Sequence, residues 1–170
     1  MFTLEVVRRP GEPGERHAFL AEGRDDPRPA LARALQSAIG EKGSVVAYNA
    51  PFEIRVLREL AAAFPELQRW TEAVCTRMVD LLVPFRGFNY YHPSQQGSAS
   101  LKSVLPALTG QGYEGLAIAD GAIAGLAYLS TLSDMPEDEA RRVRANLLEY
   151  CGLDTGGMVR IVEKLEELSR

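Results

Sequence analysis

The 170-residue sequence contains few of the residues on which disulfide scaffolds, zinc sites and membrane spans depend. Its two cysteines, Cys75 and Cys151, lie outside any C-x-x-C spacing, so neither a disulfide framework nor a structural zinc site is indicated, and we expect both to be buried. The two histidines, His17 and His92, are isolated from other metal-ligating residues. No apolar run approaches the roughly 18 residues that span a bilayer. We therefore expect a protein that does not contact membranes.

The sequence also lacks an excess of basic charge. It has 19 lysines and arginines against 23 aspartates and glutamates, a net charge of −4, and 16 of the basic residues are arginine. Nucleic-acid binding by bulk charge requires a basic face that releases counterions, so this balance argues against it and leaves open a local arginine-lined site. The first residues do not follow the basic-then-apolar order of a secretory signal, and we expect a cytoplasmic protein.

The order of apolar and turn-forming residues predicts an α/β fold in a single domain over residues 1–170. Residues 2–7 and 16–21 are typical of a β-hairpin whose loop is rich in glycine and proline. Two further short strands are predicted at 44–48 and 77–82, the first apolar enough for a buried strand of a parallel or mixed sheet. Helices are predicted between these strands and throughout the remainder of the chain, which follows the long polar loop 86–98.

The first segment that contains candidate functional residues is Tyr48-Asn49-Ala50-Pro51-Phe52-Glu53. It places Asn49 at the end of a predicted strand and Glu53 in the first turn of a predicted helix. Ligands in α/β folds bind at the carboxyl ends of strands, where a carboxylate suits Mg²⁺ or Mn²⁺. The alternative is local: Asn49 caps the helix and Glu53 complements the positive helix N-terminus.

The second segment runs from Leu147 to Thr155 and contains Tyr150 and Asp154. These two residues are four positions apart, so on a continuous helix they share one face. A phenol beside a metal-bound carboxylate can orient a water molecule or help to deprotonate it for attack on phosphorus. The alternative is a packing contact for the tyrosine and an exposed charge for the aspartate.

Together the segments resemble a known family. N-x-x-F-[D/E]-x-x-x-L after an apolar strand, then S-L-K-x-V-L, then L-x-Y-x-x-x-D is similar to the DEDD superfamily of 3′–5′ exonucleases, of the tyrosine-bearing type that includes RNase D. More closely, YNAPFE, VDLLVPFR, GSASLKSVLPAL, Y-x-x-L-x-I-x-D-G and YCGLDT resemble an uncharacterised bacterial domain-of-unknown-function family. That family is expected to have an exonuclease-like, ribonuclease H-like fold, a mixed sheet flanked by helices.

The resemblance implies a two-metal phosphodiesterase centre that hydrolyses single-stranded nucleic acid from its 3′ end with Mg²⁺ or Mn²⁺. It assigns Asp154 and Glu53 as metal ligands and Tyr150 as the residue that orients water. Asn49 supports the site without binding the metal itself. Lys102 in S-L-K contacts a phosphate or, in the alternative, is an ordinary solvated helix lysine. Glu53 stands where the superfamily generally has aspartate.

The first motif of the superfamily, Asp-x-Glu on a central strand, has no counterpart in the sequence. In one interpretation residues 2–7 and 16–21 are the second and third strands, and the chain is a fragment or shortened relative that lacks the first. In the other, residues 2–7 are the first-motif strand, with Thr3 in place of aspartate and Glu5 retained; otherwise Glu5 is an exposed strand residue. A missing central strand predicts an exposed sheet edge through which copies associate.

Asp80 and the aromatic residues of loop 86–98 each have two possible roles. Asp80 is predicted to cap the segment after its strand, with contact to the metal site as the alternative. The aromatic residues of loop 86–98 either stack on unpaired bases or pack the loop onto the domain.

We therefore expect metal-dependent 3′–5′ exonuclease-like activity in a complete protein and weak or no activity in this chain. One rival is a non-catalytic module of the same fold that binds nucleic acid or protein. A second rival is a toxin or defence component that uses the same site on another substrate.

Overall fold

The computed structural model describes residues 1–118 and 120–169. Contacts within the chain divide it into two compact units. The first unit comprises Met1–Leu31 and Gly112–Arg170, and the second comprises Ala32–Gln111.

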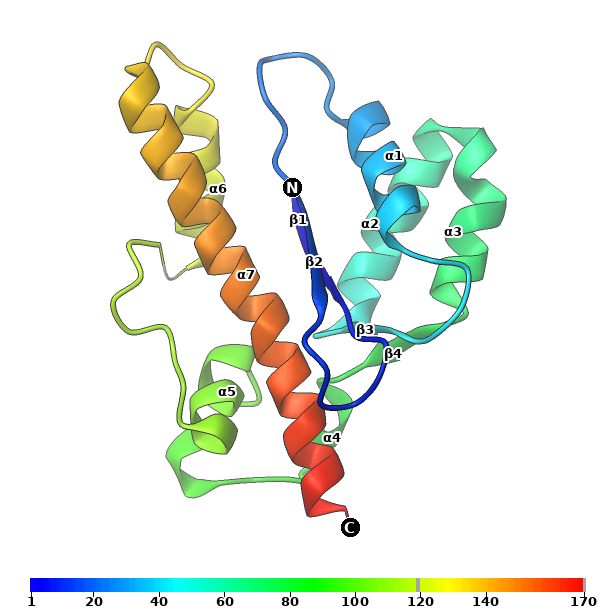
Figure 1. The fold of residues 1–170 in the computed structure, drawn as a ribbon, viewed down its shortest axis with the longest axis vertical. Helices are drawn as coiled ribbons and strands as arrows, with labels where there is room; N and C mark the ends of the chain where they lie inside the picture. Colours follow the sequence, from blue (N-terminus) through cyan, green and yellow to red (C-terminus); the bar gives the residue numbers. More distant parts are fainter. Residues whose placement is uncertain (119, 170) are drawn as a thin grey trace. The chain divides into compact units, whose positions relative to one another are not determined.

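The first unit is a β-hairpin and two helices. Strands β1 (Phe2–Val6) and β2 (Glu15–Phe19) pair antiparallel, with Leu4 opposite His17. Helix α7 (Glu137–Leu168) packs along β1, and helix α6 (Gly121–Ser130) packs against α7, as Figure 1 shows. The hairpin and the long helix thus form the frame of this unit.

Local sequence explains where these helices begin and how closely they pack. The side chain of Asp120 accepts hydrogen bonds from the backbone N–H groups of Ala122 and Ile123, at 2.8 and 3.3 Å, and this caps α6. Acidic residues occupy the first turn of α7, where the helix dipole favours them. Gly156 lies where β1 and β2 approach α7, because an added Cβ there would stand 3.3 Å from Arg16 Nη2.

The apolar core of the first unit lies between α6, α7 and the segment before α6. Leu147 is fully buried, and Tyr113, Leu116 and Val143 pack around it. Arg144 of α7 joins this helix to the end of the hairpin by donating to the backbone oxygens of Leu20 and Ala21 at 2.9 and 2.8 Å. This helix is therefore held at both the core and the hairpin.

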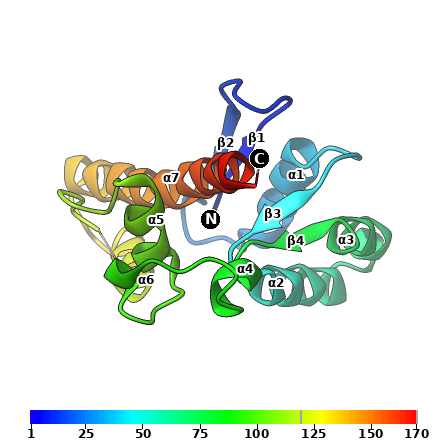
Figure 2. The same cartoon turned by 90° about the horizontal axis from the view of Figure 1, so that it is seen from below.

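The second unit contains a two-stranded parallel sheet with helices around it. Strands β3 (Val45–Ala47) and β4 (Met78–Asp80) pair in parallel, with Ala47 opposite Asp80. The connection between them is formed by α2 (Ala50–Ala63), the short 3₁₀ helix η1 (Pro65–Leu67) and α3 (Gln68–Cys75). Figure 2 shows α2 and α3 beside this sheet. The arrangement is a β-α-β unit, as the alternation of patterns predicts.

The remaining elements of the second unit are helix α1 (Arg28–Ala38), which begins in the first unit, and the segments after β4. These are α4 (Val83–Arg86), the 3₁₀ helix η2 (Pro93–Gln95) and α5 (Leu101–Thr109). Pro106 lies inside α5, which ends at Gly110 in the left-handed conformation. The most deeply buried side chains of this unit include Phe85, Val104 and Leu105.

The α/β class predicted from the sequence is confirmed, but in the described residues the strands form two separate two-stranded sheets. The expectation of a buried strand holds for Ala47 of β3, which is 6% exposed, but not for Val46, which is 37% exposed. The prediction of two buried cysteines is also wrong: Cys75 and Cys151 are partly exposed free thiols. Of the described helices, none is both long and apolar enough to cross a membrane.

Candidate functional site

The end of β3 is joined to the end of β4 through Asn49 and Asp80. Asn49 adopts the left-handed conformation with φ 71°, and its backbone N–H donates to Asp80 Oδ1 at 2.9 Å. The same oxygen accepts from the backbone N–H of Leu82 at 3.0 Å. Asp80 therefore caps the turn that follows its strand, as predicted. Its contact with Asn49, a residue 31 positions earlier in the chain, has no signal in the sequence.

The interpretation of Asn49 as a side-chain cap is wrong. Asn49 occupies the N-cap position of α2, but its side chain makes no capping hydrogen bond. Asparagine is among the few residues other than glycine that readily adopt a left-handed backbone, and this accounts for its presence at the tight turn after β3. Its side chain remains available for another role.

Glu53 lies in the first turn of α2 and carries an unsatisfied oxygen. Its Oε2 atom is buried and has no hydrogen-bond partner within the described part of the chain. Burial raises the pKa of Glu53, the hydrogen bond from its own backbone N–H opposes this rise, and the negative charge of Asp80 adds to it. A buried carboxylate oxygen without a donor is costly, and a bound cation would remove that cost.

Tyr48 is fixed by the core of the second unit. Its hydroxyl donates to the backbone oxygen of Ala99 at 2.6 Å, and its ring stacks on Phe85 with centroids 6.3 Å apart. Burial and the charge of Asp80 raise the pKa of this hydroxyl. Tyr48 therefore stays protonated at neutral pH and positions the strand end that precedes Asn49.

Lys102 lies in the first turn of α5, after Ser98 and Ser100. Ser100 occupies the N-cap of this helix without a capping bond, and its hydroxyl shares a hydrogen bond of 3.0 Å with the hydroxyl of Ser103. The assignment of Lys102 to a phosphate stays a prediction.

In the first unit, Asp154 is held by a tyrosine that sequence reasoning did not assign. The hydroxyl of Tyr113 donates to Asp154 Oδ1 at 2.5 Å. Burial raises the pKa of Tyr113, and the hydrogen bond to Asp154 raises it further. Tyr113 opens the Y-x-x-L-x-I-x-D-G stretch, which was the available signal, but nothing local connects it to a residue 41 positions later.

Tyr150 and Asp154 lie on one continuous helix, so the predicted spacing on one face is confirmed. The rings of Tyr150 and Tyr113 stand 6.2 Å apart and are tilted by 50°. Burial, followed by the charge of Asp154, raises the pKa of Tyr150 to about 12. At neutral pH the Tyr150 hydroxyl is therefore a hydrogen-bond donor rather than a base, which suits orienting a water molecule and not deprotonating it.

The strand β1 presents Thr3 and Glu5 to α7. Thr3 Oγ1 donates to the backbone oxygen of Cys151 at 2.8 Å and lies 2.6 Å from the hydroxyl of Thr155. The expectation that Glu5 is an exposed strand residue is wrong, because its side chain is only 10% exposed and pairs with Arg16 at 3.2 Å. Both residues thus have structural partners in the first unit.

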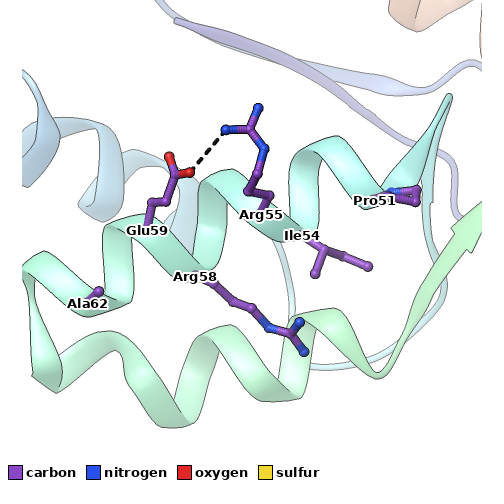
Figure 3. A pocket seen from close by; sticks show the side chains of 6 residues that line it. All are labelled: Pro51, Ile54, Arg55, Arg58, Glu59 and Ala62. Atoms are coloured by element: carbon purple, nitrogen blue, oxygen red, sulfur yellow. Dashed lines mark hydrogen bonds and ion pairs between the residues drawn. The ribbon is translucent and has the colours of Figure 1, made fainter.

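Helix α2 also carries a shallow hollow along its surface, shown in Figure 3. Arg55 pairs with Glu59 across 3.0 Å, and the guanidinium of Arg58 lies 3.8 Å from Glu72. The hollow is lined by one helix alone, through Pro51, Ile54, Arg55, Arg58, Glu59 and Ala62. Glu53 and Asn49 do not line it, so the hollow is separate from the predicted site.

The predicted residues fall into two groups. Asn49 and Glu53 lie with Asp80 in the second unit, and Tyr150 and Asp154 lie with Tyr113 in the first. Among residues 1–118 and 120–169, no group of three or more histidine, cysteine, aspartate or glutamate side chains is arranged to hold a metal ion. Within its own unit, each group provides oxygen ligands but fewer than three acids.

Comparison with curated proteins finds no match, and comparison with solved structures finds none either. A family model described as "Domain of unknown function (DUF2779)" matches residues 1–100, more than half of the chain. The match includes the hairpin, Asn49, Glu53 and Asp80 and ends before Tyr113. By this match, the chain belongs to the DUF2779 family.

Proposed function

We propose that this chain provides part of a metal-dependent 3′–5′ exonuclease site of the DEDD type, in a ribonuclease H-like fold. The observation that carries the proposal is the arrangement around Asp154. Two tyrosines, Tyr113 and Tyr150, stand beside this carboxylate, and both are protonated at neutral pH. A carboxylate beside a phenol donor can hold and orient a water molecule for phosphodiester hydrolysis.

Glu53 in the second unit and Asp154 in the first unit are each a candidate ligand for Mg²⁺ or Mn²⁺. The buried, unpartnered oxygen of Glu53 fits this role, because oxygen ligands suit these hard cations. When bound, the cations supply an activated water and neutralise the charge on the leaving oxygen.

The other residues act on substrate and water. Tyr150, whose hydroxyl is hydrogen-bonded to Asp154, would orient the attacking water beside that carboxylate, while Tyr113 fixes the rotamer of Asp154 through Oδ1. The side chain of Asn49, which has no capping role, is free to bind a polar substrate group. Lys102 places a positive charge in the first turn of α5 for a phosphate.

We expect weak or no turnover from the 170-residue chain, because the sequence has no counterpart of the Asp-x-Glu motif of the superfamily that it resembles. The same gap favours a second candidate, a catalytically inactive module of this fold that binds nucleic acid or protein. In that case Thr3, which one interpretation places at the position of the first-motif aspartate, serves only to join β1 to α7.

One assay separates these candidates. Single strands of RNA and DNA labelled at the 3′ end are incubated with stoichiometric protein and Mn²⁺. Release of label that EDTA and Asp154→Asn abolish, with Asp134→Asn as an exposed control, supports the enzyme. Binding of the strands without cleavage, unaffected by metal, supports the inactive module.

A further inference from the structure

The loop between α4 and α5 presents two aromatic rings to solvent. Phe88 is 67% exposed and Tyr91 is 44% exposed. Their ring centroids lie 5.7 Å apart, and the ring planes are tilted by 53°. The interpretation that the loop aromatics pack onto the domain therefore holds for Tyr90, whose ring meets buried Phe85 edge-on, but not for this exposed pair.

The backbone of Phe88 is held in a conformation that a bulky residue rarely adopts. Its φ is 54°, in the left-handed region where glycine is favoured. The exposed ring recovers little of this strain through burial. Strained non-glycine residues of this kind gather at ligand-binding sites. Neither backbone preference nor burial of the ring therefore explains a phenylalanine at this position.

The loop beneath the two rings is well ordered by hydrogen bonds. Gln95 is 3% exposed, accepts from the backbone N–H of His92 at 2.8 Å and donates to the backbone oxygen of Ser98 at 3.1 Å. The hydroxyl of Tyr91 accepts from the backbone N–H of Gly97 at 3.2 Å. The ring of Tyr91 is therefore held in place before any ligand arrives, which lowers the entropy lost on binding.

The charge of the surrounding sequence suits a polyanion. Residues 81–113 contain no aspartate or glutamate, although the chain as a whole has 23 acidic residues. The same stretch includes Arg86 at the end of α4 and Lys102 at the start of α5. This segment is thus locally positive in a chain of net charge −4, as a local contact with phosphates requires.

We propose that Phe88 and Tyr91 form a stacking platform for unpaired bases of single-stranded nucleic acid. Every base has an aromatic face, so such a platform binds strands with little sequence preference, and paired bases in a duplex do not offer that face. The choice of nucleic acid as the ligand rests on the proposed function, whereas the platform itself rests on the exposure, strain and order of the loop.

Binding is measured by fluorescence anisotropy in EDTA, with a labelled 15-nucleotide thymidine strand and a 15-unit abasic strand that has the same phosphates. Because stacking contributes at every contacted base, the wild-type chain is expected to bind the thymidine strand about tenfold more tightly than the abasic strand. Equal affinity for the two strands, or no binding of the thymidine strand, overturns the proposal. A platform for a protein segment gives the second of these results.

Phe88→Gly is the decisive variant, because it removes the ring and also relieves the backbone strain. We expect the preference for thymidine over abasic strand to disappear while the melting temperature is unchanged or higher. Phe88→Trp retains the preference, and strand binding quenches the fluorescence of the new indole. Leu126→Ala, which trims a 70% exposed residue of α6, leaves the preference intact.

A lower melting temperature in Phe88→Gly, or an unchanged preference for the thymidine strand, identifies the ring as structural and contradicts the platform. Because the measurement is made without metal, stacking can be found in a chain that cleaves nothing. Conversely, cleavage without any preference for bases overturns the platform alone. Failure of the proposed function and failure of this inference are thereby distinguished.

Discussion

The hydroxyl of Tyr113 donates a hydrogen bond of 2.5 Å to Oδ1 of Asp154. This bond joins the segment before α6 to the middle of α7. It fixes one carboxylate oxygen of the residue on which the proposed chemistry depends, and so makes Tyr113 a positioning residue for Asp154.

Tyr113→Phe removes this bond and leaves a carboxylate oxygen without its donor. We expect the free energy of unfolding in urea to fall by about 2 kcal/mol, the usual contribution of a hydrogen bond to a charged group. Tyr128→Phe is the matched control, because Tyr128 packs on the same core and its hydroxyl has no hydrogen bond to the described residues. An equal loss in both variants would show that the hydrogen bond to Asp154 does not contribute to the free energy of unfolding.

The tyrosines also predict how stability changes at alkaline pH. Burial raises the pKa of Tyr150 to about 12, and the pKa values of Tyr113 and Tyr48 are raised as well. The unfolded chain ionises its tyrosines near pH 10. The free energy of unfolding should therefore hold steady below about pH 10 and fall as the pH rises toward 12. Tyr150→Phe should reduce this slope, and a slope unchanged in that variant would contradict the assignment.

The strands and helices of this protein are predictable from sequence because their signals are local. The glycine- and proline-rich loop after β1, the Asp120 cap of α6 and the spacing of Tyr150 and Asp154 all lie within a few residues. The pairing of Asp80 with Asn49 and of Tyr113 with Asp154 joins residues 31 and 41 positions apart. Such contacts depend on the packing of whole elements, which periodicity does not specify.

The backbone conformations of Asn49 and Phe88 were also beyond sequence reasoning. Both residues have positive φ, at 71° and 54°. The asparagine has a recognised tendency toward this region, but its neighbours suggested an ordinary helix cap instead. The aromatic residue has no such tendency, so only the folded loop reveals its strain.

Glu53→Gln should stabilise the metal-free protein at neutral pH. Because the pKa of Glu53 is raised in the folded state, its ionisation costs free energy that is absent when the pH lies below the ordinary value near 4.3. We expect a gain in the free energy of unfolding at pH 7 that disappears below pH 4. Glu59→Gln, which breaks an exposed pair with Arg55, should give no gain. A loss of stability in Glu53→Gln at pH 7 would show that the ionised carboxylate is well satisfied.

Two substitutions separate the backbone role of Asn49 from the role of its side chain. Asn49→Gly keeps the left-handed turn and should leave the melting temperature almost unchanged, whereas Asn49→Ala should cost about 1 kcal/mol. Affinity for single strands then reports the side chain alone. If Asn49→Gly binds strands as the wild type does, the side chain has no part in substrate binding.

Self-association through an exposed sheet edge stays a prediction, and β3 with β4 is the sheet to test. Val46 and Val79 face each other across these strands and are both partly exposed. Sedimentation velocity should show association that rises with protein concentration and that Val46→Lys suppresses, since a charged residue blocks edge pairing. A monomer at every concentration would contradict the prediction.

Mn²⁺ binding, followed through the electron paramagnetic resonance signal of the free ion, measures whether Asp154 and Glu53 are metal ligands. We predict that the wild-type chain binds Mn²⁺ and that Asp154→Asn and Glu53→Gln each weaken binding about tenfold or more, while Glu59→Gln has no effect. If the wild-type chain leaves the free-ion signal unchanged, or if both variants bind Mn²⁺ as tightly as the wild type does, the claim is contradicted.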